Sequence, residues 1–188
     1  MIAMNTLLHT CCAPCSIYCV DSLRQEGIQP TSYWFNPNIH PYTEYRSRKT
    51  TLEEYAKSIQ LPLIIDNTYG LRSFVRAVID DLEHRCFYCY QVRLAQTARY
   101  AAEHHFDSFS TTLLVSPYQK HDALIAAGEA AARQYNVPFL YRDFRVGFQQ
   151  GQEQAKTLDL YRQKYCGCIF SEEERYRWKQ IQKEKEQR

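Results

Sequence analysis

The stretch MNTLLHTCCAPC, residues 4–15, joins an apolar run to three closely spaced cysteines. Residues 4–9 predict a β-strand that continues directly into residues 10–15, and a helix is expected from there to Leu23. Pro14, between Cys12 and Cys15, is typical of the first turn of a helix. The first cysteines are therefore expected at a point where a strand ends and a helix begins.

Short apolar runs alternate with longer amphipathic stretches along the rest of the chain. We expect further strands at residues 32–36, 61–66, 109–115 and 137–141, and helices at residues 41–59, 71–80, 91–106 and 121–135. Strands separated by helices of this length favour βαβ units and a parallel sheet. Ligands of such sheets bind beyond the carboxyl ends of the strands, near a topological switch point. We predict one α/β domain over residues 1–188, with no linker and no internal repeat.

The tail, residues 171–188, predicts a C-terminal helix. Ser171 and Glu174 have the spacing of a capping box, and the acidic run between them suits a helix N-terminus. The remainder is basic and mixed, and its charged residues include Arg175, Arg177, Lys179, Lys183 and Lys185. Two interpretations stay open for it, a solvated terminal helix and a helix that contacts phosphate.

Composition narrows the class of protein. Lys and Arg total 23 against 21 for Asp and Glu, so the formal net charge is only +2, which does not favour a protein that coats nucleic acid non-specifically. The N-terminal stretch lacks a cationic segment, its apolar run is short for a signal peptide, and no apolar run is long enough for a membrane span. We therefore expect a cytoplasmic protein without membrane contact, in which clustered cysteines serve metal or redox chemistry rather than structural disulfides.

The eight cysteines fall into three clusters, with the patterns CC-x2-C-x3-C, C-x2-C and C-x-C. They are Cys11, Cys12, Cys15 and Cys19, then Cys86 and Cys89, then Cys166 and Cys168. A C-x2-C spacing lets two thiolates face one centre, and thiolate is the ligand that zinc and iron–sulfur clusters prefer. The first cluster also lies at a predicted helix N-terminus, where the helix dipole favours thiolates.

Three interpretations compete for these cysteines. A structural zinc site needs four thiolates and leaves several cysteines unused. A thioredoxin-like pair at Cys12 and Cys15 leaves most of them unused. An iron–sulfur site fits better, because three or four cysteines hold a cluster and the others can bind a second metal or cycle as a thiol–disulfide pair. Cys19, four residues after Cys15 on the predicted helix, is interpreted as a small buried hydrophobic residue.

Six stretches together resemble one known family, the cobalamin-independent epoxyqueuosine reductases of QueH type. They are LLHTCCAPC at 7–15, FNPNIHP at 35–41, RCFYCYQVRL at 85–94, TTLLVSPYQKH at 111–121, LYRDFR at 140–145 and LYRQKYCGCIFS at 160–171. The resemblance covers nearly the whole chain apart from the C-terminal tail. It implies a parallel-sheet α/β sandwich of the HUP-like (adenine-nucleotide α-hydrolase-like) class, with the three cysteine clusters converging at the C-terminal ends of the strands.

The resemblance also implies an activity, the two-electron reductive removal of the epoxide oxygen of epoxyqueuosine at the tRNA wobble position. This is the last step in making queuosine. The implied partners are tRNAs with GUN anticodons (Tyr, His, Asn and Asp) and an external electron donor. The implied cofactors are a 4Fe-4S cluster and, beside it, a second mononuclear iron or zinc. The rival hypothesis is a zinc-stabilised tRNA-binding module without catalysis.

By position, the resemblance implies seven metal-ligating cysteines: Cys11, Cys12, Cys15, Cys86, Cys89, Cys166 and Cys168. Cys11 and Cys12 are expected to take part in catalysis. Because an epoxide oxygen leaves once a Lewis acid or a proton takes up its charge, proton donors are also expected, namely His9, His40, Tyr118 or Asp143. Candidate substrate-binding residues are Thr111, Thr112, Tyr90, Arg93, Arg142 and Arg145.

Overall fold

The computed structural model describes residues 4–186, apart from the side chains of residue 179 and residues 182–186. Within that part of the chain the sheet has four parallel strands in the order β3-β2-β1-β4. The strands are β1 (Asn5–His9), β2 (Gln29–Trp34), β3 (Leu63–Ile65) and β4 (Ser108–Thr111). The prediction of a parallel α/β fold is confirmed.

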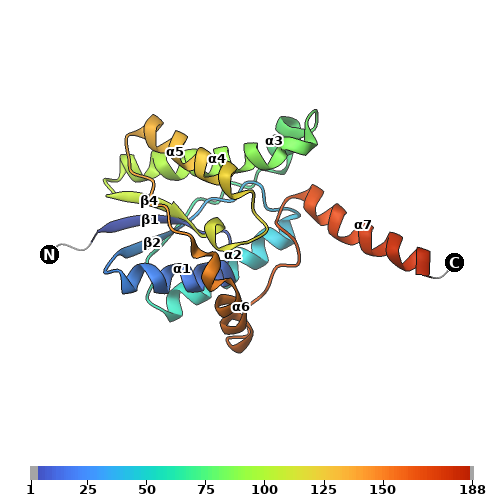
Figure 1. Cartoon of the computed structure of the whole chain (residues 1–188), viewed down its shortest axis with the longest axis horizontal. Coiled ribbons are helices and arrows are strands. Elements are labelled where there is room, and N and C mark those ends of the chain that lie inside the picture. The colour runs from blue at the N-terminus through green and yellow to red at the C-terminus, as the bar shows by residue number, and fades with distance from the viewer. Residues whose placement is uncertain (1–3, 187–188) are drawn as a thin grey trace.

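Helices cover both faces of the sheet. One face carries α1 (Ala13–Gln25), α2 (Tyr42–Ser58) and α6 (Phe148–Thr157), and the other carries α3 (Leu71–Val78), α4 (Arg85–Glu103) and α5 (His121–Tyr135) (Figure 1). Helix α7 (Ile169–Glu186) extends away from the body of the molecule (Figure 1). Short 3-10 turns connect these elements at η1 (Leu82–His84), η2 (Thr112–Val115) and η3 (Phe144–Gly147).

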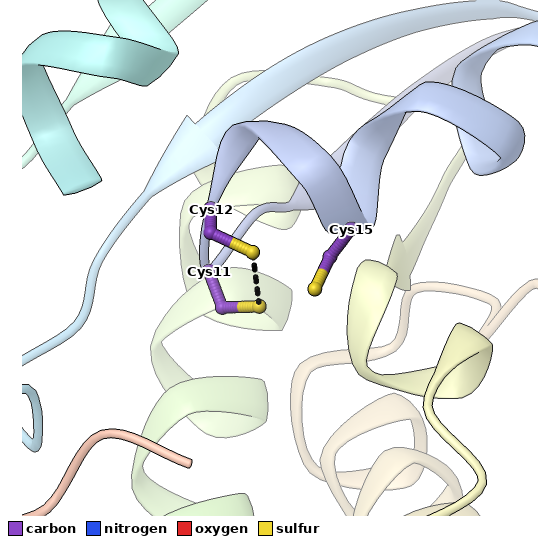
Figure 2. A group of neighbouring side chains, drawn as sticks. All are labelled: Cys11, Cys12 and Cys15. Carbon is purple, nitrogen blue, oxygen red and sulfur yellow. Dashed lines mark hydrogen bonds between the residues drawn. The ribbon is translucent and has the colours of Figure 1, made fainter. Parts of the chain in front are cut away.

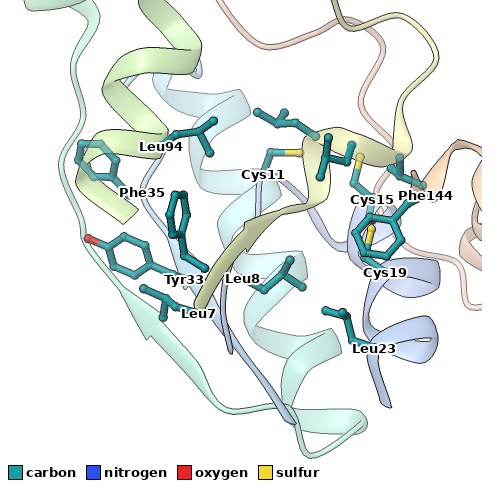
Figure 3. Close-up of a cluster of buried hydrophobic side chains, with 14 of the residues drawn as sticks. Leu7, Leu8, Cys11, Cys15, Cys19, Leu23, Tyr33, Phe35, Leu94 and Phe144 are labelled. Atoms are coloured by element: carbon teal, nitrogen blue, oxygen red, sulfur yellow. Dashed lines mark hydrogen bonds between the residues drawn. The ribbon is translucent and has the colours of Figure 1, made fainter. Parts of the chain in front are cut away.

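The central strand β1 is buried on both sides, which is typical of a parallel sheet with two helical layers. Leu7 and Leu8 are each 0% exposed, although their side chains point to opposite faces. Figure 3 shows the apolar side chains that surround β1, including Leu23 from α1 and Leu94 from α4. This packing fixes the position of the residues that follow β1.

Two predicted strand segments have a different structure. Residues 137–141 do not form a fifth strand, because Pro138 has no N–H to donate and only an isolated parallel bridge joins Phe139 to Phe109. The predicted strand at 109–115 ends at Thr111, whose hydroxyl accepts the N–H of Leu113 and turns the chain into η2. That turn carries Thr112 toward the end of β1.

The helix boundaries also differ from the predictions. Helix α4 begins at Arg85 rather than at residue 91, so its first turn contains the Cys86–Cys89 pair. Helix α6 was not predicted, and the C-terminal helix begins at Ile169 rather than at Ser171. Residues 187 and 188 of the predicted basic helix lie outside the described residues, as do the side chains of Lys179, Lys183 and Lys185.

The strand order places a topological switch point at the end of β1. The chain passes from β1 to β2 and β3 on one side and returns to β4 on the other. The residues after β1 therefore face those after β2 and β4, where α/β folds bind ligands. None of the helices in the described part of the chain is long and apolar enough to cross a membrane.

Candidate metal centre

Three cysteine thiols meet at the switch point. The Sγ atoms of Cys11, Cys12 and Cys15 all lie within 4.8 Å of one another, and all three residues are buried. Figure 2 shows the three side chains turning toward one another from the start of α1, with Cys11 and Cys12 in contact at 3.8 Å. Three convergent thiols are the donors of a thiophilic metal site with one position left for another ligand. We call them the thiol triad.

Local backbone structure builds the triad. Cys12 is the N-cap of α1 with an extended backbone, and Pro14 in the first turn starts the helix as predicted. From the β4 side, Thr112 Oγ1 accepts the backbone N–H of Cys11 at 3.3 Å. Gln163 Nε2 donates to Cys12 Sγ at 3.1 Å and lies 3.4 Å from Cys15 Sγ. The triad is therefore held from three separate parts of the chain.

The pKa values of the triad diverge, as expected for thiols in contact. The contacts of Cys11 with the thiols of Cys12 and Cys15 hold the pKa of Cys11 well below its usual range. Burial raises the pKa of Cys12, and the contact with Cys11 raises that of Cys15. Together these shifts favour one thiolate at Cys11 that is stabilised by two neutral thiols.

The other four predicted ligands line a single pocket between α4 and the start of α7. Cys86 and Cys89 come from the first turn of α4, while Cys166 and Cys168 come from the coil before α7. We call them the thiol quartet. Four thiols around one space match the donor number of a 4Fe-4S cluster.

Polar groups point at the quartet thiols. Arg93 Nη2 donates to Cys89 Sγ at 3.0 Å, and the backbone N–H of Ser171 donates to Cys168 Sγ at 3.4 Å. Gln119 Nε2 lies 3.6 Å from Cys166 Sγ. Burial raises the pKa of Cys89 to about 12 and also raises that of Cys86. N–H donors around buried sulfur are the surroundings that an anionic thiolate centre needs.

Two buried oxygens beside the thiols have no hydrogen-bond partner among the described residues. They are Gln163 Oε1, next to the triad, and Asn38 Oδ1, whose residue lines the quartet pocket. Unpaired buried acceptors are rare in folded proteins and call for a water, an ion or a ligand. Both thiol groups therefore have the features of sites that hold a bound group.

The sequence interpretation missed the residue that holds the quartet coil in place. Arg48 of α2 is 1% exposed, and its guanidinium donates to the carbonyl of Cys166 at 2.9 Å and to that of Tyr165 at 3.0 Å. Its Nε donates to Glu44 at 2.6 Å. The i,i+4 spacing of Glu44 and Arg48 was the only signal in the sequence, and it does not reveal a partner 118 residues away.

His40 holds the same coil. Its backbone N–H donates to the Gly167 carbonyl at 2.8 Å, and its own carbonyl accepts the Tyr165 hydroxyl at 2.7 Å. Its Nδ1 accepts the Ile169 N–H at 3.4 Å, while Nε2 bonds the Pro37 carbonyl at 3.0 Å. Burial lowers the pKa of His40 to about 4. With both ring nitrogens in use, His40 acts here as a structural link.

The other predicted proton donors have different surroundings. Burial and then the charge of Arg93 lower the pKa of His9 to about 3, and its ring bonds Thr111 Oγ1 at 2.9 Å and the Phe35 carbonyl at 3.2 Å. The Arg145 guanidinium lowers the pKa of Asp143 to about 2, so Asp143 is a carboxylate at neutral pH. Tyr118 is 83% exposed, beside the pocket residue Gln119.

The predicted substrate-binding residues divide into buried and exposed ones. Thr111, Thr112, Tyr90 and Arg93 are all buried, and Tyr90 and Arg93 line the quartet pocket. The two exposed residues are in ion pairs: Arg145 with Asp143 at 2.6 Å and Arg142 with Glu26 at 2.9 Å. Glu26 follows the end of α1, a 13-residue helix about 20 Å long, so Arg142 lies far from the triad at its start.

Cys19 belongs to neither thiol group. It is 0% exposed, its thiol donates to the Cys15 carbonyl at 3.3 Å, and Figure 3 shows it among apolar side chains near Phe144. Burial raises its pKa well above the usual value. The structure thus places Cys19 in the core, as its position outside the motifs indicates.

Comparisons with known proteins agree on one family. The family model for epoxyqueuosine reductase QueH matches residues 6–174. A protein of that name from Dehalococcoides mccartyi is 39% identical over 175 residues, which cover 93% of this chain and 96% of the relative. The protein of the same name from Thermotoga maritima is 35% identical over 176 residues, covering 89% and 90% of the two chains.

A solved structure supports the fold. It is the crystal structure of a predicted subunit of tRNA methyltransferase from Methanocaldococcus jannaschii, with a TM-score of 0.56 and 16% identity. The match covers 81% of this chain and 74% of that one. At this identity the likeness concerns the fold alone, and it agrees with the parallel α/β fold expected from the sequence.

Proposed function

Because the chain belongs to the epoxyqueuosine reductase QueH family, we propose that it reduces epoxyqueuosine in tRNA to queuosine, the last step of queuosine synthesis. The observation that carries this proposal is the convergence of three buried thiols at the switch point of the sheet, with four further cysteines lining one pocket. A site of this kind suits electron transfer to a bound substrate better than a structural role alone.

The reaction removes the epoxide oxygen and leaves a carbon–carbon double bond. It consumes two electrons and two protons, and the oxygen leaves as water. The electrons come from an external donor, and cobalamin is not required. The chain must therefore hold the electron-carrying group, exclude bulk water from it and supply protons at the leaving oxygen.

We assign the two thiol groups to two metal centres. Cys86, Cys89, Cys166 and Cys168 would hold a 4Fe-4S cluster, since they are four thiols around one pocket with N–H donors beside them. The thiol triad would hold a single iron or zinc, since three thiols leave one position open. When bound, these groups supply one-electron transfer and Lewis acidity.

The chain's own residues prepare the site. The Thr112 hydroxyl accepts the backbone N–H of Cys11 and so fixes its position. The side-chain amide of Gln163 donates hydrogen bonds to the thiols of Cys12 and Cys15. Burial of the triad keeps bulk water from the thiols. Among the predicted proton donors we favour Tyr118, because its phenol is exposed and it adjoins the pocket residue Gln119 in the sequence, while Asp143 is held as a carboxylate.

The partner is a tRNA, whose wobble base must be unstacked to reach the thiols. We propose two tyrosines as contacts with a flipped base: Tyr90, which lines the pocket from a buried position, and the exposed Tyr118, which precedes the pocket residue Gln119 in the sequence. Arg142 and Arg145 lie on the surface, and we propose them as phosphate contacts. Replacing Arg142 with alanine should then reduce the slope of log affinity against log salt by about one contact. An unchanged slope would exclude Arg142 from the tRNA surface.

A direct test uses protein reconstituted without oxygen with iron and sulfide. It is mixed with epoxyqueuosine-containing tRNA and a chemical reductant, and the nucleosides are then quantified by mass spectrometry. We expect conversion to queuosine, near-complete loss of conversion in Cys89→Ala, and retention in Cys19→Ala. Conversion at the full rate by zinc-only protein would refute the iron–sulfur proposal. A colourless zinc protein that binds tRNA but converts nothing would support the non-catalytic alternative.

A further inference from the structure

Two arginines are buried among the described residues, and their charges are balanced differently. Arg48 is 1% exposed and forms an ion pair with Glu44 at 2.6 Å. Arg93 is 2% exposed, and no described carboxylate lies within ion-pair distance of it. A guanidinium stays protonated in proteins, so Arg93 carries a full positive charge in the interior.

Within the part of the chain that the structure describes, the side chain of Arg93 donates its hydrogen bonds to Cys89 alone. Arg93 Nη2 donates to Cys89 Sγ at 3.0 Å, and its Nε donates to the Cys89 carbonyl at 3.2 Å. Arg93 also lines the pocket with all four thiols of the quartet.

A buried charge without a counter-charge is strongly destabilising. The position of Arg93 is therefore reasonable only if the thiols around it carry negative charge in the working protein. Neutral thiols would leave the guanidinium unpaired, whereas thiolates bound to a metal centre provide the missing anion.

We propose that Arg93 is the counter-charge of the centre held by the thiol quartet and raises its reduction potential. This inference rests on the proposed function, since it requires a redox centre in the pocket. Each electron accepted by the centre adds one negative charge, and the nearby cation stabilises the reduced form more than the oxidised form. Arg93 is thus a positioning and tuning residue rather than a surface contact for tRNA phosphate.

The same pocket provides a matched control. Arg85 also lines it, but its guanidinium forms an ion pair with Glu174 at 2.6 Å and its side chain is 17% exposed. Glu174 and solvent offset the charge of Arg85, so its removal should change the potential much less.

The test is a redox titration of anaerobically purified holoprotein, with low-potential viologen mediators and electron paramagnetic resonance as the readout. Two unit charges about 4 Å apart attract strongly at an effective dielectric constant of about 20. We therefore expect Arg93→Gln to lower the equilibrium constant for reduction at least tenfold, about 59 mV for a one-electron couple. Arg93→Lys, which keeps the charge, should stay close to the wild type, and Arg85→Gln should shift less than Arg93→Gln.

Three results would overturn the inference. One is an unchanged potential in loaded Arg93→Gln, and another is an equal shift in Arg85→Gln. The third is failure of both Arg93 variants to bind the cluster while they remain folded, because the role would then be steric. If only Arg93→Gln fails to load, a near-wild-type potential in Arg93→Lys supports the role of charge.

The wild-type titration separates this inference from the proposed function. If the wild-type protein holds no redox-active iron, the proposed function fails. If it holds a reducible cluster whose potential does not depend on Arg93, the inference alone fails.

Discussion

Replacing Arg48 with methionine should destabilise the protein by about 3–5 kcal/mol, because it breaks a buried ion pair from one side. Glu44 is 8% exposed and would keep its charge without a cation. The carbonyls of Tyr165 and Cys166 would lose their donors at the same time. Since small domains are stable by about 5–15 kcal/mol in total, a large fraction of the stability is at stake.

The double variant Arg48→Met/Glu44→Met separates two effects of removing Arg48: the cost of leaving the Glu44 carboxylate unpaired and the loss of the other contacts of the arginine side chain. With the carboxylate removed as well, the loss should be smaller by about 2 kcal/mol or more than in Arg48→Met alone. Urea unfolding of anaerobic protein at matched iron content measures both values. Lys156→Met, in the exposed pair with Glu153, serves as a surface control and should change stability by about 0–1 kcal/mol.

A loss below about 1 kcal/mol in Arg48→Met would refute this reasoning, as would a double variant that is less stable than the single one. Alkylation of Cys168 provides a second readout. Because Arg48 anchors the carbonyls of the quartet coil, the normally buried Cys168 should react faster in Arg48→Met than in the wild type.

Three further predictions concern single residues. The pKa of His40 falls from 6.5 to about 4 on folding, so the unfolded chain binds more protons between these values, and His40 alone should lower stability by about 1–2 kcal/mol from pH 7 to pH 5. A His40→Asn variant should lose this share of the pH dependence and keep the share of His9, whose pKa burial lowers to about 3. Gly147→Ala should cost about 1–3 kcal/mol in thermal or urea unfolding, because a Cβ there would lie 2.0 Å from the Tyr18 ring. Cys19→Ala should leave the iron content of the purified protein unchanged, and loss of iron would place Cys19 among the ligands.

The cysteine groups could be predicted because their signal is local. Cys11, Cys12 and Cys15 follow an apolar strand directly, and their spacing with Pro14 fixes both the helix start and the direction of the thiols. The parallel sheet could be predicted for the same reason, since strand and helix patterns are read over short windows. The division of the cysteines into a triad and a quartet could not, because it depends on how distant segments pack.

The elements that sequence reasoning missed depend on distant contacts. Helix α6 is polar and contains glycine, and it packs on α1 where a Cβ at Gly151 would lie 3.5 Å from the Pro14 carbonyl. Arginine is a residue type that often contacts phosphate, but Arg93 is 2% exposed. Its side chain bonds Cys89, which lies four residues earlier on a part of α4 that was not predicted to be helical.

We propose that the seven cysteines form two centres, a cluster at the quartet and a single metal at the triad. An anomalous-scattering map at the iron edge, from crystals grown without oxygen, tests it most directly. We predict a compact multi-iron peak among Cys86, Cys89, Cys166 and Cys168, and a separate single-metal peak at Cys11, Cys12 and Cys15. A multi-iron peak at the triad, or a map without iron at the quartet, would contradict the claim.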